Sequence, residues 1–160
     1  MLLALISPAY SSGSKVRGFL LQLLPSGDVI QAGSIATWKV GSPVIVVVRM
    51  VNDSDRTVHY SLTSPARDYE IQLLDASGRA VRERDELRKM KESSSQRVWV
   101  ESRNMLGDLK PGESADDAIT VSNLYDLSSP GEYSLRVERK FPDVGKHRVR
   151  SERLLFRITH

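Results

Sequence analysis

The clearest pattern in the chain is an alternation of apolar and polar residues close to its end. Within Pro130–Thr159, apolar residues occupy every second position in two stretches, Tyr133, Leu135 and Val137, then Leu154, Phe156 and Ile158. The residues between them are mostly polar or charged, which is typical of strands with one buried and one solvated face. The connection Phe141–Lys146 contains the Pro and Gly of a chain reversal. The sequence therefore predicts an antiparallel hairpin here.

The most apolar stretch is Val44–Val51, where six of eight residues are β-branched or otherwise strongly strand-forming. Because almost every position is apolar, we expect this strand to lie at the centre of a sheet with both faces largely covered. Asn52–Asp55 has the composition of a turn, and Thr57–Leu62 then resumes an alternating pattern. These three segments predict a second hairpin.

Shorter stretches of the same kind predict further strands at Phe19–Leu24, Ile35–Val40, Tyr69–Leu73, Arg79–Arg82, Val98–Val100 and Ile119–Val121. Turn residues such as Pro25–Asp28, Asp75–Gly78 and Leu109–Glu113 separate them. Only Glu83–Glu92 has a helical pattern, and a helix of that length needs packing to be stable. About eight short strands divided by turns predict an all-β fold, an antiparallel two-sheet β-sandwich with one short helix in a connecting loop.

Length and composition fit one domain. The chain has 160 residues, with 40% hydrophobic and 27% charged side chains, and its mean hydropathy is −0.30. We predict a domain at residues 18–160. Residues 1–17 are either a partial signal peptide, since Met1–Ile6 is apolar and small residues follow, or a disordered or strand-like N-terminus. No apolar run reaches the length of a membrane-spanning helix, and the absence of cysteine excludes disulfides and thiolate chemistry.

A resemblance to known domains begins at Leu127–Tyr133, which is followed by the alternating strand. Together with Lys39–Asp55, Tyr69–Gly78 and Leu109–Ser114, it resembles bacterial immunoglobulin-like domains of mostly uncharacterised exported proteins. It is also similar in outline to the Bacillus intracellular proteinase inhibitor family. The resemblance implies an immunoglobulin-like sandwich at residues 18–160, in which Tyr133 returns its hydroxyl to upstream backbone as a tyrosine corner. It differs from antibody-type domains in lacking a cysteine pair.

The net charge is +3, and the positive charge is concentrated after Gly131, where eight Lys and Arg face four Asp and Glu. The cluster consists of Arg139, Lys140, Lys146, His147, Arg148 and Arg150. Such a cluster would meet an anionic surface, or it is the solvated side of a hairpin. Because no aromatic residues are interleaved for base stacking, we predict that nucleic acid is not a partner.

The sequence contains no strong catalytic or metal-binding motif. His59, His147 and His160 do not have the spacing of metal ligands, and the chain has neither a nucleophile elbow nor a phosphate-binding loop. Asn52–Asp55 with Asp143, or with Asp116 and Asp117, would offer oxygen ligands to calcium, although turns favour the same residues. We expect no enzyme activity, cofactor or metal, and we expect Trp38 and Trp99 to pack in or beside the core rather than to act as contact anchors.

These observations predict a non-enzymatic, exported binding or accessory module, periplasmic or secreted, that presents a surface to a protein or glycan partner. The alternative is a protease inhibitor of the intracellular proteinase inhibitor type. Its reactive loop would be Lys91–Gln96 or Phe141–Arg148, and the second of these offers the basic residues that trypsin-like proteases prefer. Both functions rest on analogy between folds.

Overall fold

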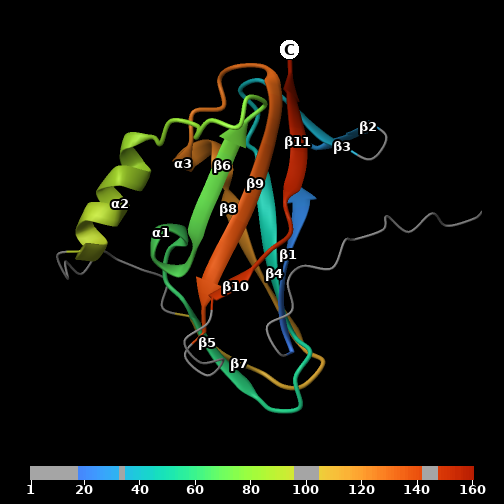
Figure 1. Ribbon diagram of the computed structural model, residues 1–160, viewed down its shortest axis with the longest axis vertical. Helices are drawn as coiled ribbons and strands as arrows, with labels where there is room; N and C mark the ends of the chain where they lie inside the picture. Colours follow the sequence, from blue (N-terminus) through green and yellow to red (C-terminus); the bar gives the residue numbers. More distant parts are fainter. Residues whose placement is uncertain (1–17, 33–34, 96–104, 142–147) are drawn as a thin grey trace, which may run out of the picture.

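The computed structural model describes residues 18–32, 35–95, 105–141 and 148–160, which form a mainly β fold (Figure 1). The strands of this part are β1 (Phe19–Ser26), β2 (Ile30–Ala32), β3 (Ile35–Lys39), β4 (Ile45–Asn52), β5 (Val58–Leu62), β6 (Glu70–Asp75), β7 (Met105–Leu109), β8 (Ser114–Thr120), β9 (Gly131–Lys140), β10 (Arg148–Arg150) and β11 (Leu154–Thr159). Three helices accompany them, α1 (Pro65–Asp68), α2 (Asp85–Ser95) and α3 (Val121–Leu124).

The first sheet has the order β1-β4-β8, with antiparallel pairing throughout. The predicted central position of the most apolar strand is therefore confirmed. One face of β4 is fully buried, at Val46, Val48 and Met50, and no residue of its other face is fully exposed. On that second face Arg49 donates two hydrogen bonds of 2.8 Å to the carboxylate of Asp116, which lies directly opposite on β8.

The second sheet is built around β9, the strand with the clearest alternation in the sequence. β6 pairs with one edge of β9, and β10 followed by β11 pairs with the other edge, all antiparallel. The predicted hairpin is thus confirmed in its two described strands. Between β10 and β11 the returning chain has one residue more than β9, which is a β-bulge. The buried hydroxyl of Ser151 occupies this bulge and accepts a hydrogen bond from the Val137 amide at 3.0 Å.

Two sequence predictions about the sheets are wrong. The pairing of β11 with β3 is parallel, so the second sheet is mixed rather than purely antiparallel. β5 does not return along β4 as a hairpin; it pairs with β7 in a separate two-stranded ribbon, which makes three sheets instead of two. The turn after Asn52 redirects the chain because the buried Asn52 amide donates to the carbonyls of Arg56 and Leu109 at 2.8 Å each.

A single hydrophobic core joins the two larger sheets. In Figure 1 the sheet that contains β9 lies in front of the strands β4 and β8, and buried residues of both sheets belong to the same cluster. Trp38, which is fully buried, contacts Phe156 edge to face at 5.5 Å between ring centroids. Phe156 in turn stacks on Tyr133, also at 5.5 Å. The expectation that Trp38 packs in the core is confirmed, and Trp99 lies outside the described residues.

The predicted hydrogen bond of the tyrosine corner is confirmed. The Tyr133 hydroxyl donates to the Ser129 carbonyl, four residues upstream, at 2.6 Å. Tyr133 itself is buried at the start of β9. This bond ties the crossing segment before β9 to the strand that organises the second sheet.

The helices and short connections depart from the prediction in detail. The predicted helix Glu83–Glu92 is present as α2, shifted toward the C-terminus, and Leu87 is its buried anchor. The predicted strand at Arg79–Arg82 is reduced to an isolated bridge between Ala80 and Leu74. The strand β8 ends at Thr120, so Val121 begins α3 instead of ending a strand. Residues 1–17, the predicted strand Val98–Val100 and the reversal 142–147 lie outside the described residues.

Candidate functional site: the Arg139 cleft

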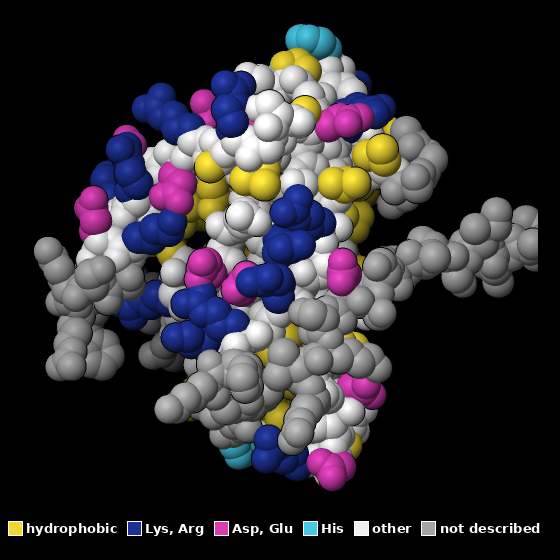
Figure 2. Space-filling view, viewed as in Figure 1, with side chains coloured by type: hydrophobic (Ala, Val, Ile, Leu, Met, Phe, Trp, Pro, Cys, Tyr) yellow, Lys and Arg dark blue, Asp and Glu magenta, His cyan; other side chains and the backbone are white. Residues whose placement is uncertain are grey.

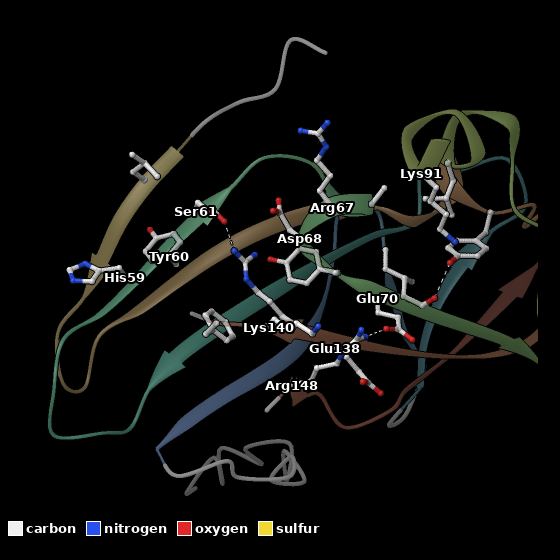
Figure 3. Close-up of a pocket in the computed structure, with 18 residues that line it drawn as sticks. His59, Tyr60, Ser61, Arg67, Asp68, Glu70, Lys91, Glu138, Lys140 and Arg148 are labelled. Carbon is white, nitrogen blue, oxygen red and sulfur yellow. Dashed lines mark hydrogen bonds and ion pairs between the residues drawn. The ribbon is translucent and has the colours of Figure 1, made fainter. Parts of the chain in front are cut away.

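Figure 3 shows a cleft of about 660 Å³, which we call the Arg139 cleft. Its walls come from the β5–β7 ribbon, α1, the start of β6, α2 and the end of β9, segments that lie far apart in the sequence. The residues that matter most for its chemistry are Tyr60, Leu106, Arg67, Tyr69, Arg139 and Lys140. A cleft of this volume lies within the usual range for ligand sites, roughly 300–1,000 Å³.

The one-turn helix α1 forms one side of the cleft. Pro65 stands in the first turn of the helix, where its missing amide hydrogen costs nothing. The Asp68 carboxylate closes the turn by accepting from the Thr63 amide at 2.6 Å and from the Thr63 hydroxyl at 2.9 Å. α1 buries none of its residues, so it holds Arg67 at the cleft rim. Tyr69, the first residue after the helix, is buried.

The β5–β7 ribbon forms the opposite side. Tyr60 lies directly across from Gly107, and a Cβ atom on Gly107 would stand 2.6 Å from the Tyr60 ring. The glycine is therefore what lets this ring lie against the neighbouring strand. Next to it Leu106 lines the cleft while leaving 83% of its surface exposed, so the ribbon supplies an apolar rim.

The floor of the cleft contains a buried cation. Arg139 follows Leu135 and Val137 on the inward face of β9 and is only 5% exposed. Its guanidinium carbon lies 5.1 Å from the ring centroids of both Tyr69 and Phe141. These two contacts are cation–π interactions, each worth about 0.5–2 kcal/mol.

The hydrogen bonds of this guanidinium are incomplete. Nη2 of Arg139 donates to the Ser61 carbonyl, the bond drawn as a dashed line at Ser61 in Figure 3. The Nε and Nη1 atoms are buried and have no hydrogen-bond partner among the described residues. A buried donor without a partner costs about 1–3 kcal/mol, and more when it is charged. The floor of the cleft therefore carries donors that no described acceptor satisfies.

Tyr69 stands beside this guanidinium and adds a third unsatisfied group. Its hydroxyl is buried and forms no hydrogen bond of normal geometry within the described part of the chain. Burial raises the pKa of Tyr69 far above its ordinary value, and the nearby Asp117 carboxylate raises it further, while Arg139 acts in the opposite direction. The phenol therefore keeps its proton and remains a hydrogen-bond donor at neutral pH.

Ion pairs surround the cleft mouth without cancelling its positive charge. Arg148 pairs with Glu70 on the neighbouring strand, and Lys91 pairs with Glu83. Lys140 is exposed and has no ion pair with any described residue. Five basic and three acidic side chains line the cleft, and Glu83, the partner of Lys91, adds a fourth acidic group, so the positive excess is a single charge. This arrangement can attract and hydrogen-bond a monoanionic group.

The histidine that lines the cleft, His59, does not have the surroundings of a catalytic residue. His59 pairs with Asp108 at 2.6 Å across the ribbon, but the two side chains are 68% and 63% exposed. Catalytic His–carboxylate pairs act where water is excluded and the partners are held rigidly. An exposed pair on a two-stranded ribbon lacks that environment.

Asn52 and Asp116, which the sequence offered as calcium ligands, form hydrogen bonds within the chain. Asn52 is fully buried and its side-chain oxygen accepts from the amide and hydroxyl of Ser54. Asp116 is held by Arg49, and Asp143 lies outside the described residues. No group of three or more His, Asp or Glu side chains in the described ranges comes together as a metal ion would require.

The predicted basic cluster is divided by strand alternation. Lys140, Arg148 and Arg150 are exposed, and Figure 2 shows Lys and Arg side chains gathered on that face over β9 and β10. Arg139 points to the opposite, inward side. Lys146 and His147 lie outside the described residues, and His160 is exposed at the end of the chain.

The two predicted reactive loops differ in what the structure describes. Lys91–Ser95 belongs to α2 and is helical, whereas Gln96 lies outside the described residues. Phe141, at the start of the second segment, is buried and packs on Phe19 with 4.1 Å between ring centroids. Arg148 belongs to β10, and the residues between Phe141 and Arg148 are not described.

The two central residues of the cleft, Arg139 and Tyr69, were not singled out together from the sequence. The signal was nevertheless present. Arg139 continues the apolar alternation of β9, and Tyr69 continues that of Ile71 and Leu73 on β6. A charged residue in phase with buried positions is an indicator of a buried polar site.

A comparison with protein-family models found no match, and a search of curated proteins found no similar sequence. None of the helices in the described ranges is long and apolar enough to cross a bilayer.

Proposed function

We propose that the chain is a non-enzymatic binding module that is exported and that binds a protein or glycan partner in the Arg139 cleft. The observation that carries this proposal is the cleft itself. It combines an exposed apolar rim at Leu106, exposed charge at Lys140 and a buried arginine with unsatisfied donors at its floor. Interfaces concentrate their binding energy in such pockets, where aromatic and arginine side chains are desolvated.

The proposed fold is an immunoglobulin-like β-sandwich. It is supported by the hydrogen bond from Tyr133 to Ser129 and by the core shared between the sheets of β4 and β9. Domains of this architecture often carry binding sites on the loops and ribbons at one end of the sheets. The cleft, formed by a ribbon, a one-turn helix and strand ends, has that placement.

The proposal of export rests on the apolar segment Met1–Ile6 and the small residues after it. The intact mass of the protein recovered from envelope and medium fractions of the organism tests this part. A trimmed N-terminus is the expected result. Recovery of the chain only from the cytoplasm, with Met1 present, would contradict it.

Substitution of an exposed rim residue tests the binding site. Leu106→Arg places a long charged side chain in the cleft mouth, and because Leu106 is 83% exposed the fold should be unaffected. The matched control is Leu155→Arg, since Leu155 is also an exposed leucine, at 59%, and does not line the cleft.

The assay is capture of partners from envelope extracts together with binding to an array of glycans. We expect a partner that binds the wild type and Leu155→Arg equally and binds Leu106→Arg at least tenfold more weakly, a loss of about 1.4 kcal/mol. A partner that binds all three proteins equally would show that the cleft is not the site.

The protease inhibitor alternative stays a prediction. A substrate-like inhibitory loop must be extended to enter a protease active site, and the helical Lys91–Ser95 does not have that conformation. Of the two predicted reactive loops, Phe141–Arg148 remains. The absence of inhibition of a panel of serine proteases at micromolar concentration would remove this alternative.

A further inference from the structure

The strongest unexplained feature of the molecule is the guanidinium of Arg139. It is about 95% buried yet uses only one nitrogen, Nη2, in a hydrogen bond, and that bond is to a neutral acceptor, the Ser61 carbonyl. Burial of a charge is costly unless it is paired and fully hydrogen-bonded. The contacts with the rings of Tyr69 and Phe141 offset part of this cost, but they leave Nε and Nη1 without acceptors among the described residues.

The groups around the guanidinium indicate what kind of acceptor would fit. The Tyr69 hydroxyl is a further donor at the same place. Arg67 and Lys140 add positive charge at the exposed rim. The acidic groups nearby are Asp68, Glu70 and Glu138 in the cleft lining and Asp117 next to Tyr69. A monoanion satisfies the unpaired donors of Arg139, while a doubly charged phosphate group would meet about twice the repulsion from these acidic groups.

We propose that the Arg139 cleft binds a carboxylate of an acidic peptide segment, with Arg139 as the anion-binding residue and the Tyr69 hydroxyl as a second donor. The apolar rim at Leu106 and Tyr60 then receives an apolar side chain next to the carboxylate. This inference rests on the proposed binding function and specifies the chemistry of its partner. A charge-assisted hydrogen bond between guanidinium and carboxylate is roughly twice as strong as a neutral one.

Binding requires a movement of the arginine. Because Nε and Nη1 are buried, the Arg139 side chain must turn toward the cleft mouth to meet the carboxylate. It exchanges the neutral bond to Ser61 for a charge-assisted bond. The side chain is thus held near the opening by its bond to Ser61 and by its contacts with the rings of Tyr69 and Phe141.

The test compares two blocked pentapeptides that differ only in charge, Ac-Leu-Asp-Leu-Glu-Leu-amide and Ac-Leu-Asn-Leu-Gln-Leu-amide. Affinity is measured by calorimetry or NMR titration with the full chain. We expect the wild type to prefer the acidic peptide at least tenfold. Equal binding of the two peptides, or no binding of the acidic one at millimolar concentration, would overturn the proposal.

Arg139→Met keeps an unbranched apolar stem at this position and removes the charge. We expect it to lose the preference for the acidic peptide and to melt at or above the wild-type temperature, because a poorly satisfied buried charge is removed. Arg153→Met is the matched control, since Arg153 is exposed and does not line the cleft, and it should retain the preference. Failure of Arg139→Met to fold would assign the guanidinium a structural role and overturn the proposal.

Tyr69→Phe provides a second, milder variant. It retains the ring that contacts Arg139 and removes one donor, so we expect a weaker acidic preference, by a factor of about two to ten, with stability equal to or above that of the wild type because an unsatisfied buried hydroxyl is removed. An unchanged preference would exclude the hydroxyl from the site. Binding to a polymer of glucuronate, without binding to the acidic peptide, would overturn the choice of a peptide.

These results separate this inference from the proposed function. A partner that is lost with Leu106→Arg but retained by Arg139→Met would leave the cleft as the binding site and remove the carboxylate from it. A partner that is retained by Leu106→Arg would remove the cleft itself.

Discussion

The hydroxyl of Tyr133 gives the sharpest test of how the second sheet is held together. Tyr133→Phe removes one oxygen atom and leaves the ring stacked on Phe156. The lost interaction is the 2.6 Å hydrogen bond to the Ser129 carbonyl. Since Ser129 is exposed, its carbonyl can regain a hydrogen bond from water after the substitution, and the full penalty of an unpaired buried acceptor does not apply.

The expected loss is therefore the net value of one hydrogen bond, about 1 kcal/mol of unfolding free energy. For a chain of this length that corresponds to a fall in melting temperature of roughly 2–4 °C. Urea unfolding followed by tryptophan fluorescence measures it, and the slope of free energy against urea should stay unchanged because the surface buried on folding is the same.

Tyr60→Phe is the matched control. Tyr60 is half-buried on the ribbon, and its hydroxyl has no hydrogen bond to a described residue, so its removal should cost much less. Equal stability of the two variants would mean that the tyrosine corner contributes nothing here. A loss above about 3 kcal/mol for Tyr133→Phe would instead mean that the ring itself has shifted and left a cavity.

Three further predictions concern single contacts and are all measured by urea unfolding. Ser151→Ala should cost about 1–3 kcal/mol, because the buried Val137 amide loses its acceptor in the β-bulge, and a neutral result would refute that role. Gly78→Ala should lower the free energy of unfolding by about 1–2 kcal/mol because of its positive φ alone. Gly18→Ala should cost more, since a Cβ atom at Gly18 would also lie 2.7 Å from the backbone of Ser54. Equal losses would contradict this close approach. The hydrogen bond from the Arg49 guanidinium holds the pKa of Asp116 below its ordinary 3.8. The unfolded chain therefore binds the proton more readily, and the free energy of unfolding decreases as the pH is lowered from about 5 to 3. Asp116→Asn should make this decrease smaller, and an identical pH profile would contradict the ion pair's contribution.

The strands with a clear period of two could be predicted from the sequence. In β9, buried residues alternate with partly exposed ones because one face is packed on the core and the other meets water, and β11 and β6 follow the same pattern over part of their length. β4 was placed correctly at the centre of a sheet because its composition is nearly all apolar. These are the cases in which burial of a face determines the residue pattern directly.

The strands that were missed have weak or misleading patterns. β8 was predicted only at its end, near Ile119, because two acidic residues stand in its middle. Asp116 and Asp117 are tolerated there because β8 has only one neighbour in its sheet and Arg49 pairs with Asp116. β7 contains Gly107, whose lack of a side chain makes room for a ring from the facing strand. Neither reason is visible without the neighbouring strand.

Pairing partners were the least predictable feature. The segments on either side of Asn52 looked like a hairpin, yet the buried amide of Asn52 bonds forward to Arg56 and across to Leu109, which directs β5 toward β7. The parallel pairing of β3 with β11 joins segments more than a hundred residues apart. Local patterns fix which residues face inward, but not which edge a strand meets.

The candidate site shows the same division. The phase of Arg139 on β9 indicates that it points inward, which the sequence could have shown. Its contacts with Tyr69 and Phe141 depend on the pairing of β6 with β9 and on the position of the residue that follows β9. The cleft exists only because five segments meet, and no single segment carries its signature.

The most direct test of the central claim, that the Arg139 cleft is where the partner binds, is amide hydrogen exchange of the full chain with and without the partner recovered by the wild type. Slower exchange should be concentrated in α1, the β5–β7 ribbon and the end of β9, and it should disappear when Leu106→Arg replaces the wild type. Protection concentrated on the opposite face of the second sheet, around Leu155 and Arg153, would contradict the account.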